Sequence, residues 1–310
     1  MGYRELSPVL QEIAEKELNE NSSRIREDLE YIRDWINKEP HLNARTDDQF
    51  LLSFLRGCKF SLHRTQAKLD YYYTVKTIVT ELFSNRDPYD RDIQEALRFG
   101  SVLPLPNTEY PGGPRIILLR SSVLNSQNNF YLMYFKILLM MLDVLLLEDD
   151  NFTVSGVIFW SDGRNTSMRD IMHLTPALLK KMQGISEKAY PLRMKAVHST
   201  SCPPMAESLF NLSKSLAPAK QSQRMFMYSE ANHEQFCKKI PIQLQPQEYG
   251  GENGSVKTLT EIWKNKIESY SKWFLEDMQY GTNEELRTGA PKTSANLFGV
   301  EGTFRKLDID

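Results

Sequence analysis

The stretch FYLMYFKILLMMLDVLLL, residues 130–147, is the feature that most restricts how this chain can fold. Its charged residues, Lys136 and Asp143, lie seven positions apart, so on a helix they share one narrow stripe of an otherwise apolar surface. A charge at the centre of a membrane-inserted helix costs about 2.5–3.5 kcal/mol, and two of them disfavour a membrane span. We therefore expect a helix buried inside a folded domain, where it lines a core or a cavity.

Composition and charge limit the classes of protein to which a chain with this helix can belong. The chain has 310 residues, of which 41% are hydrophobic and 25% charged, as in ordinary globular proteins. A net charge of −2 gives no electrostatic case for nucleic-acid binding. The cysteines, Cys58, Cys202 and Cys237, form neither a disulfide framework nor a metal pattern. The first residues lack the apolar core of a signal peptide, so we expect a cytoplasmic protein.

Periodicity divides the chain into a helical part and a part where strands alternate with helices. Apolar spacing predicts a helix over residues 9–37 and two shorter helices before residue 92. Strands are predicted over residues 115–120, 154–160, 194–200 and 225–229. Strands that alternate with helices indicate an α/β domain with a mostly parallel sheet. We expect a helical domain over 1–92, an α/β domain over 93–281 and a tail over 282–310 that packs back through Leu297, Phe298, Val300 and Phe304.

No catalytic or metal-binding motif is present in the sequence. The five histidines are scattered, and no HExxH, GxSxG or Walker-type glycine loop occurs. The glycine pair Gly112-Gly113 stands between prolines and predicts a turn. We therefore expect no enzyme activity, no catalytic residues and no cofactor.

Five motifs in order resemble the CRAL-TRIO family. The segment TDDQFLLSFLRGCKFSLHRTQAKLDYYYTVK is similar to the family's helical N-terminal part. The segments SGVIFWSDG, HLTPALLKK, AYPLRMKAVHS and IPIQLQPQEYGGENGS then follow in the family's order, over about residues 25–280. The most specific piece is Tyr249-Gly250-Gly251-Glu252. The ending LFGVEGTFRKLDID resembles that of insect members of the tocopherol-transfer-like and retinaldehyde-binding-like type.

This resemblance implies that a helical N-terminal unit docks on an α/β domain whose sheet and helices enclose an apolar cavity for one lipophilic ligand. A dry pocket of this kind selects ligands by shape, with a few polar groups that set orientation. Each candidate side chain could equally belong to a plain core, because an apolar stripe does not reveal a void. The candidate pocket residues are Phe135, Leu139, Leu142, Phe159, Leu174, Leu178, Met182, Ile185, Tyr190 and Val197.

The segment between prolines at 203–218 is a candidate gate. The resemblance implies a mobile helix whose apolar face covers the pocket and dips into a bilayer interface when it opens. The alternative is an amphipathic helix that stays packed on the body. The candidate gate residues are Met205, Leu209, Phe210, Leu212 and Leu216.

Two cations alternate with apolar residues in AYPLRMKAVHST, so Arg193 and Lys195 point to one side of a strand. In tocopherol-transfer-like members, basic residues here and after the gate bind phosphoinositide phosphates, and they match Arg193, Lys195 and Arg224. A fourth basic position, on the N-terminal hairpin, is Cys58 in this chain, and either Lys59 or Arg56 is left to replace it. The alternative is that Arg193 and Lys195 are ordinary surface charges.

The sequence thus predicts a monomeric protein, peripheral at phosphoinositide-containing membranes, that binds and transfers one lipophilic ligand of the tocopherol or retinoid type. A hydrophobic small molecule or lipid is its expected partner, and nucleic acid is not. The alternatives are a regulatory or scaffolding module of the same fold that senses lipid without bulk transfer, or a phospholipid transfer protein. The identity of the cargo is not encoded in any residue pattern found.

Overall fold

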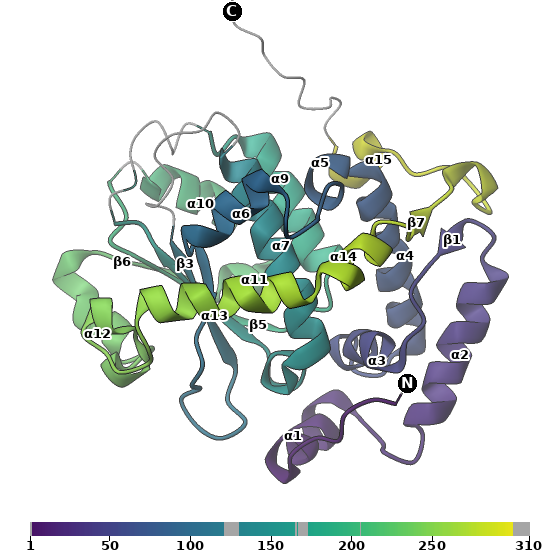
Figure 1. Cartoon of the computed structure of the whole chain (residues 1–310), viewed down its shortest axis with the longest axis horizontal. Coiled ribbons are helices and arrows are strands. Elements are labelled where there is room, and N and C mark those ends of the chain that lie inside the picture. Colours follow the sequence, from purple (N-terminus) through teal and green to yellow (C-terminus); the bar gives the residue numbers. More distant parts are fainter. Residues whose placement is uncertain (1, 121–129, 165, 167–172, 205, 300–310) are drawn as a thin grey trace, which may run out of the picture.

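A five-stranded sheet forms the centre of the protein in a computed structural model that describes residues 2–120, 130–164, 166, 173–204 and 206–299 (Figure 1). The strand order is β2-β3-β4-β5-β6. The β2–β3 pair is antiparallel and the other pairs are parallel. The strands are β2 (Val102–Pro104), β3 (Arg115–Arg120), β4 (Val157–Asp162), β5 (Met194–Thr200) and β6 (Met225–Tyr228). The mostly parallel α/β fold predicted from the sequence is confirmed.

Helices cover both faces of this sheet. One face carries Ile117, Phe159 and the apolar cluster that includes α7 (Phe130–Glu148), α9 (Pro176–Gly184) and π-helix η2 (Ile185–Ala189). Helix α10 (Ala206–Leu216) lies against α9 and α11 (Ala219–Ser222). The opposite face packs Trp160 against α12 (His233–Cys237) and the start of α13 (Val256–Ser269).

Of the N-terminal helices, those before residue 84 gather at one side of the sheet domain, beside α14 (Ser271–Asp277), as Figure 1 shows, whereas α6 packs against α7 and α13. Their apolar faces join the same cluster as α7. A short sheet of β1 (Leu42–Asn43) and β7 (Gly281–Thr282) links this side to the C-terminal segment. The helices are α1 (Pro8–Leu18), α2 (Ile25–Lys38), α3 (Asp48–Gly57), α4 (Leu62–Ile78), α5 (Thr80–Phe83) and α6 (Arg91–Arg98).

Two predicted elements differ from the structure. The helix expected over 9–37 is divided into α1 and α2, because Asn19 ends α1 in the left-handed conformation with φ 61°. Asparagine tolerates that conformation better than most residues. The strand expected over 154–160 begins at Val157, because residues Asn151–Ser155 form the π-helix η1 and Gly156 turns the chain with φ 98°.

Helix α7 is buried in the protein core, as its composition predicts. Asp143 is fully buried, and its carboxylate accepts hydrogen bonds from the Arg86 guanidinium and, at 3.2 Å, from the Tyr72 hydroxyl. Lys136 donates to the Ser84 carbonyl at 2.8 Å. The two charged residues within the apolar stretch therefore have partners inside the fold. Among the helices of the described residues, none has the length and apolar character needed to cross a membrane.

The described part of the tail packs on the body. Phe298, in α15 (Ser294–Phe298), is 2% exposed and belongs to the cluster that contains α9. Arg287 Nη1 donates to Asp70 of α4 at 2.8 Å, and Arg287 Nε donates to Glu284 at 2.6 Å. Although burial acts in the opposite direction, this hydrogen bond from Arg287 helps to lower the pKa of Glu284 to about 2. The predicted contacts of Val300 and Phe304 fall outside the described residues.

We predict that Asp143→Asn lowers the free energy of unfolding by about 3–5 kcal/mol, because it leaves the buried Arg86 guanidinium without its main counter-charge. Urea denaturation at neutral pH measures this change. Asp34→Asn is the control, because Asp34 is exposed on α2 and should leave the urea midpoint unchanged. If the two substitutions lower the urea midpoint equally, the buried pair of Asp143 and Arg86 contributes no more to stability than an exposed residue does.

Candidate functional site

The predicted pocket residues converge on one apolar cluster between the sheet and its covering helices. Nine of the ten belong to this cluster, and Val197 pairs in register with Phe159, which is one of the nine. Phe135, Phe159, Leu174, Met182 and Val197 are partly exposed. The others are fully buried: Leu139, Leu142, Leu178, Ile185 and Tyr190.

The two partly exposed residues on the central strands, Phe159 and Val197, help to distinguish a cavity wall from a filled core. Ile117, Phe159 and Val197 lie side by side across β3, β4 and β5. Ile117 is 0% exposed, whereas Phe159 and Val197 retain accessible surface although helices cover this face. A close-packed interior leaves no such surface on central strands. These two side chains are therefore the best candidates for the wall of a ligand cavity.

Tyr190 lies on the side of the cluster that faces the N-terminal helices. Its ring meets the Tyr72 ring of α4 edge-on, with centroids 5.4 Å apart. Burial raises the pKa of Tyr190 well above its ordinary value, and Asp143 adds to this effect. Tyr190 thus borders the buried polar group around Asp143, while Phe159 and Val197 lie on the sheet.

Helix α10 matches the predicted gate segment in position and pattern. Leu209, Phe210, Leu212 and Leu216 are all partly buried, and no residue of the helix is fully buried. Met205 falls outside the described residues. An amphipathic helix usually buries its apolar stripe against the body. The loose cover of the apolar face of α10 therefore favours a helix that rests over a space.

Phe210 borders a second hollow, next to the outer strand of the sheet. This hollow has a volume of about 450 Å³ and is lined by α10, all of β6 and residues near α12. Lys214 of α10 reaches the carbonyl oxygen of Met225 across it, at 3.4 Å. This long polar contact ties the gate candidate to β6.

The three cations predicted at the strand end come together at the start of β5. The Arg224 guanidinium donates to the carbonyl oxygen of Met194, between Arg193 and Lys195. Partial burial and then the Arg193 charge lower the pKa of Lys195, Arg224 adds to this effect, and Glu17 opposes it. Arg193 Nη1 is buried without a hydrogen-bond partner. We call Arg193, Lys195 and Arg224 the cation cluster.

A carboxylate that the sequence analysis missed contacts this cluster. Glu17 of α1 accepts a hydrogen bond from Arg193 Nη2 at 2.7 Å and lies 3.6 Å from Lys195 Nζ. This hydrogen bond from Arg193 is the main reason that the pKa of Glu17 is lowered. The two partners are 176 residues apart in sequence, so no local pattern could have paired them.

The hairpin between α3 and α4 decides between the two candidate substitutes for Cys58. Arg56 is 1% exposed and binds Glu20 through two hydrogen bonds of 2.9 and 3.1 Å, so it is engaged inside the protein. Lys59 is exposed, and its carbonyl accepts from Asn19 at the end of α1, at 3.4 Å. Cys58 is buried, which raises the pKa of its thiol. Of the two candidates, Arg56 is thus engaged with Glu20, and Lys59 has an exposed side chain.

The Tyr249-Gly250-Gly251 motif has a structural role in this fold. The Tyr249 hydroxyl donates to Asp162 Oδ2 at the end of β4, at 2.6 Å. A Cβ at Gly251 would lie 2.0 Å from the carbonyl oxygen of Gln245, so no other residue fits. The motif that contributes most to the resemblance thus closes a loop against the sheet and lies apart from the cation cluster.

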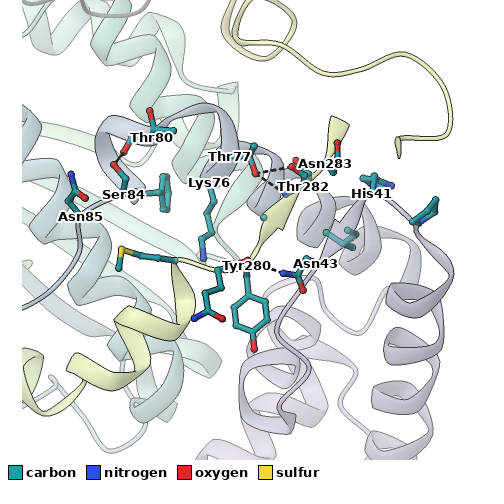
Figure 2. Close-up of a pocket in the computed structure, with 16 residues that line it drawn as sticks. His41, Asn43, Lys76, Thr77, Thr80, Ser84, Asn85, Tyr280, Thr282 and Asn283 are labelled. Carbon is teal, nitrogen blue, oxygen red and sulfur yellow. Dashed lines mark hydrogen bonds between the residues drawn. The ribbon is translucent and has the colours of Figure 1, made fainter. Parts of the chain in front are cut away.

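A polar groove of about 550 Å³ lies between α4, β1 and β7 (Figure 2). Hydroxyl and amide groups line it, and Thr77 and Thr282 are hydrogen-bonded to each other there. Lys76 enters it from α4, but its ammonium group is bound to Asp277 at 2.5 Å. None of the predicted pocket residues lines this groove.

The comparisons with known proteins match both halves of the chain. Residues 21–93 match a family model described as Pinta-like, UBA domain, and residues 103–251 match the CRAL/TRIO domain. A human protein named alpha-tocopherol transfer protein-like is 29% identical over 249 residues, which cover 80% of this chain and 71% of that protein. Clavesin-1 of Rattus norvegicus is 31% identical over 248 residues, which cover 79% of this chain and 69% of clavesin-1.

A solved structure titled "Crystal structure of Sfh5" aligns with a TM-score of 0.45 and 11% sequence identity, over 85% of this chain and 99% of that one. The family assignment depends on the sequence matches alone. With a domain match over the sheet and a relative above 30% identity along most of its length, the protein belongs to the CRAL/TRIO family.

Proposed function

We propose that this protein binds one lipophilic molecule between its sheet and α10 and exchanges it at membranes that contain phosphoinositides. The observation that carries the proposal is the accessible apolar surface of Phe159 and Val197 on the central strands of a covered sheet face. Helix α10, which has no fully buried residue, lies against the neighbouring α9. Relatives named for tocopherol transfer support a lipophilic cargo. The reaction is transfer, so the proposal requires no catalytic residue.

The hydrophobic effect supplies the binding energy for such a cargo. Removal of apolar surface from water contributes about 25 cal/mol per Å², without directional bonds. A single long apolar molecule therefore binds tightly in a space lined by Phe135, Phe159, Leu174, Met182 and Val197. Methionine adapts its shape to the ligand, which suits Met182 to a wall that meets different cargos.

Helix α10 is the proposed exit. Its apolar residues Leu209, Leu212 and Leu216 are partly buried, and in this proposal they cover the ligand and enter a bilayer interface after the helix swings away. The apolar surface that opening uncovers then contacts the nonpolar part of the bilayer and not water. Opening at a membrane therefore costs less free energy than opening in water. This difference would confine release to the membrane surface.

The cation cluster is the proposed membrane contact. Arginine binds phosphate oxygens through two parallel hydrogen bonds, and lysine adds a compact charge. Arg193 Nη1 is a buried donor without a partner, and an entering phosphate would supply the missing acceptor. Lys195, at 36% exposure, and the exposed Lys59 extend the positive surface toward solvent.

We expect Val197→Trp to abolish co-purification of lipid and to leave the urea midpoint close to that of the unmodified protein, because the larger ring would fill the cavity. Solvent extraction followed by mass spectrometry measures the bound lipid. In a filled core the same substitution would overpack the interior and cost about 1–3 kcal/mol of stability.

Val157→Trp is the matched control for this experiment. Val157 lies on the neighbouring strand and is 0% exposed, so the larger side chain has no space to enter and the protein should be destabilised. If Val197→Trp destabilises the protein as much as Val157→Trp does, the cavity is absent at this position. A protein that purifies without lipid and still binds vesicles would be a scaffold of the same fold.

The double variant Arg193→Ala, Lys195→Ala should weaken binding to vesicles that contain a phosphatidylinositol bisphosphate by roughly tenfold to thirtyfold, since each cation near an anionic surface contributes about 1 kcal/mol. Vesicle sedimentation measures the affinity. Lys257→Ala with Lys272→Ala is the control, because it removes the same charge from exposed positions on α13 and α14. Transfer rates and binding that do not respond to the first pair would refute the docking role.

A further inference from the structure

We infer that Glu17 is an intramolecular ligand of the cation cluster, which an entering phosphate must displace, and that it thereby sets the affinity of the site. This inference rests on the proposed docking function. It identifies a residue of α1 that takes part in phosphate binding although α1 lies far from β5 in the sequence.

The contacts of Glu17 are those of a bound anion. One carboxylate oxygen serves two cations, because Oε2 accepts from Arg193 Nη2 at 2.7 Å and lies 3.6 Å from Lys195 Nζ. Arg193 is 11% exposed and Lys195 36% exposed, whereas Glu17 is 48% exposed. The carboxylate thus lies on the solvent side of the arginine, on the path that a phosphate from solution or from a headgroup would take.

The position of Glu17 on its own helix is unfavourable, which indicates that its partners hold it there. Helix α1 ends at Leu18, so Glu17 lies in the last turn, where the helix dipole disfavours a negative charge. Lys16, in the same turn, pairs with Glu12, so its charge is already engaged and does not compensate that of Glu17. The stabilisation of Glu17 at this place therefore comes from Arg193 and Lys195.

Helix α1 is attached by a small apolar contact that does not include the main core. Leu10, Ala14 and Leu18 pack on Val154 in a cluster of their own. The buried Leu18 and the pair of Glu20 with Arg56 hold the chain at the end of α1, so the loss of Glu17's partners loosens the last turn locally and the core stays in place. The turn after Asn19 leads into α2, which is anchored separately in the main cluster.

The charges determine which ligands can displace Glu17 from the cation cluster. Once Glu17 is displaced, the three cations carry three positive charges. A phosphate monoester carries about −1.5 to −2 at neutral pH and so offsets more of this charge than a carboxylate with one charge does. An inositol polyphosphate headgroup and a soluble inositol phosphate share this chemistry, so the experiment must distinguish the two sources.

Glu17→Gln tests the inference because it keeps the shape of the side chain and removes its charge. We expect about fivefold tighter binding to phosphatidylcholine vesicles doped with phosphatidylinositol bisphosphate, measured by sedimentation. Glu15→Gln is the matched control on the same helix, because Glu15 is exposed and accepts a hydrogen bond from Gln11 of the same helix. Both variants should keep the urea midpoint of the unmodified protein.

Hydrogen exchange gives a second readout, because with a purely structural role of Glu17 ligand binding would leave the exchange of the last amides of α1 unchanged. In the unmodified protein, ligand binding should speed exchange of the last amides of α1, because Glu17 loses its partners. In Glu17→Gln these amides should exchange faster already without ligand. Soluble inositol trisphosphate and the doped vesicles are tested separately: a response to both indicates a general polyphosphate site, and a response to vesicles alone indicates a headgroup site.

The outcomes separate the inference from the function on which it rests. If Glu17→Gln binds vesicles no more tightly than Glu15→Gln, the competitor role is wrong, while loss of binding in the Arg193, Lys195 double variant keeps the docking function. If the double variant binds as well as the unmodified protein, the docking function fails and the inference fails with it.

Discussion

A buried group of two carboxylates and two cations holds the two halves of this protein together. Asp143 of α7 pairs with Arg86, and Asp277 of α14 pairs with Lys76 of α4, all with side chains at most 3% exposed. Arg86 also lies 3.6 Å from Asp277, so the pairs form one group. Removal of any member would leave a buried charge without compensation. The group therefore fixes the position of the N-terminal helices on the sheet domain.

The same arrangement positions the strand end where the cation cluster lies. The Tyr72 hydroxyl binds Asp143, and its ring packs against Tyr190. One residue further, Pro191 packs so closely on the end of α3 that a Cβ at Gly57 would lie 2.4 Å from it. Arg193 follows two residues later. The contact between the helical part and the sheet domain thus brings α1, and with it Glu17, to the cluster.

The sequence predicts those features that depend on local periodicity. Alternation of strands and helices indicates the mostly parallel sheet. Strand parity predicts that Arg193 and Lys195 point to one side, and in the structure both contact Glu17. It does not predict the left-handed turn at Asn19, because the apolar spacing of α1 and α2 is the same on both sides of it. It also cannot predict contacts such as Glu17 with Arg193, which depend on how two elements distant in the chain pack.

Membrane contact and the proposed opening of α10 are linked by a short piece of chain. Helix α10 ends at Leu216, and Arg224 follows α11 directly before β6. Its guanidinium holds the Met194 carbonyl, so the end of this connection is fixed to β5 beside the cluster. A phosphate that draws Arg224 toward itself would act on the same connection that carries α10. The eight residues between Leu216 and Met225 join the end of α10 to Arg224 directly. Coupling between docking and release therefore needs no path through the core.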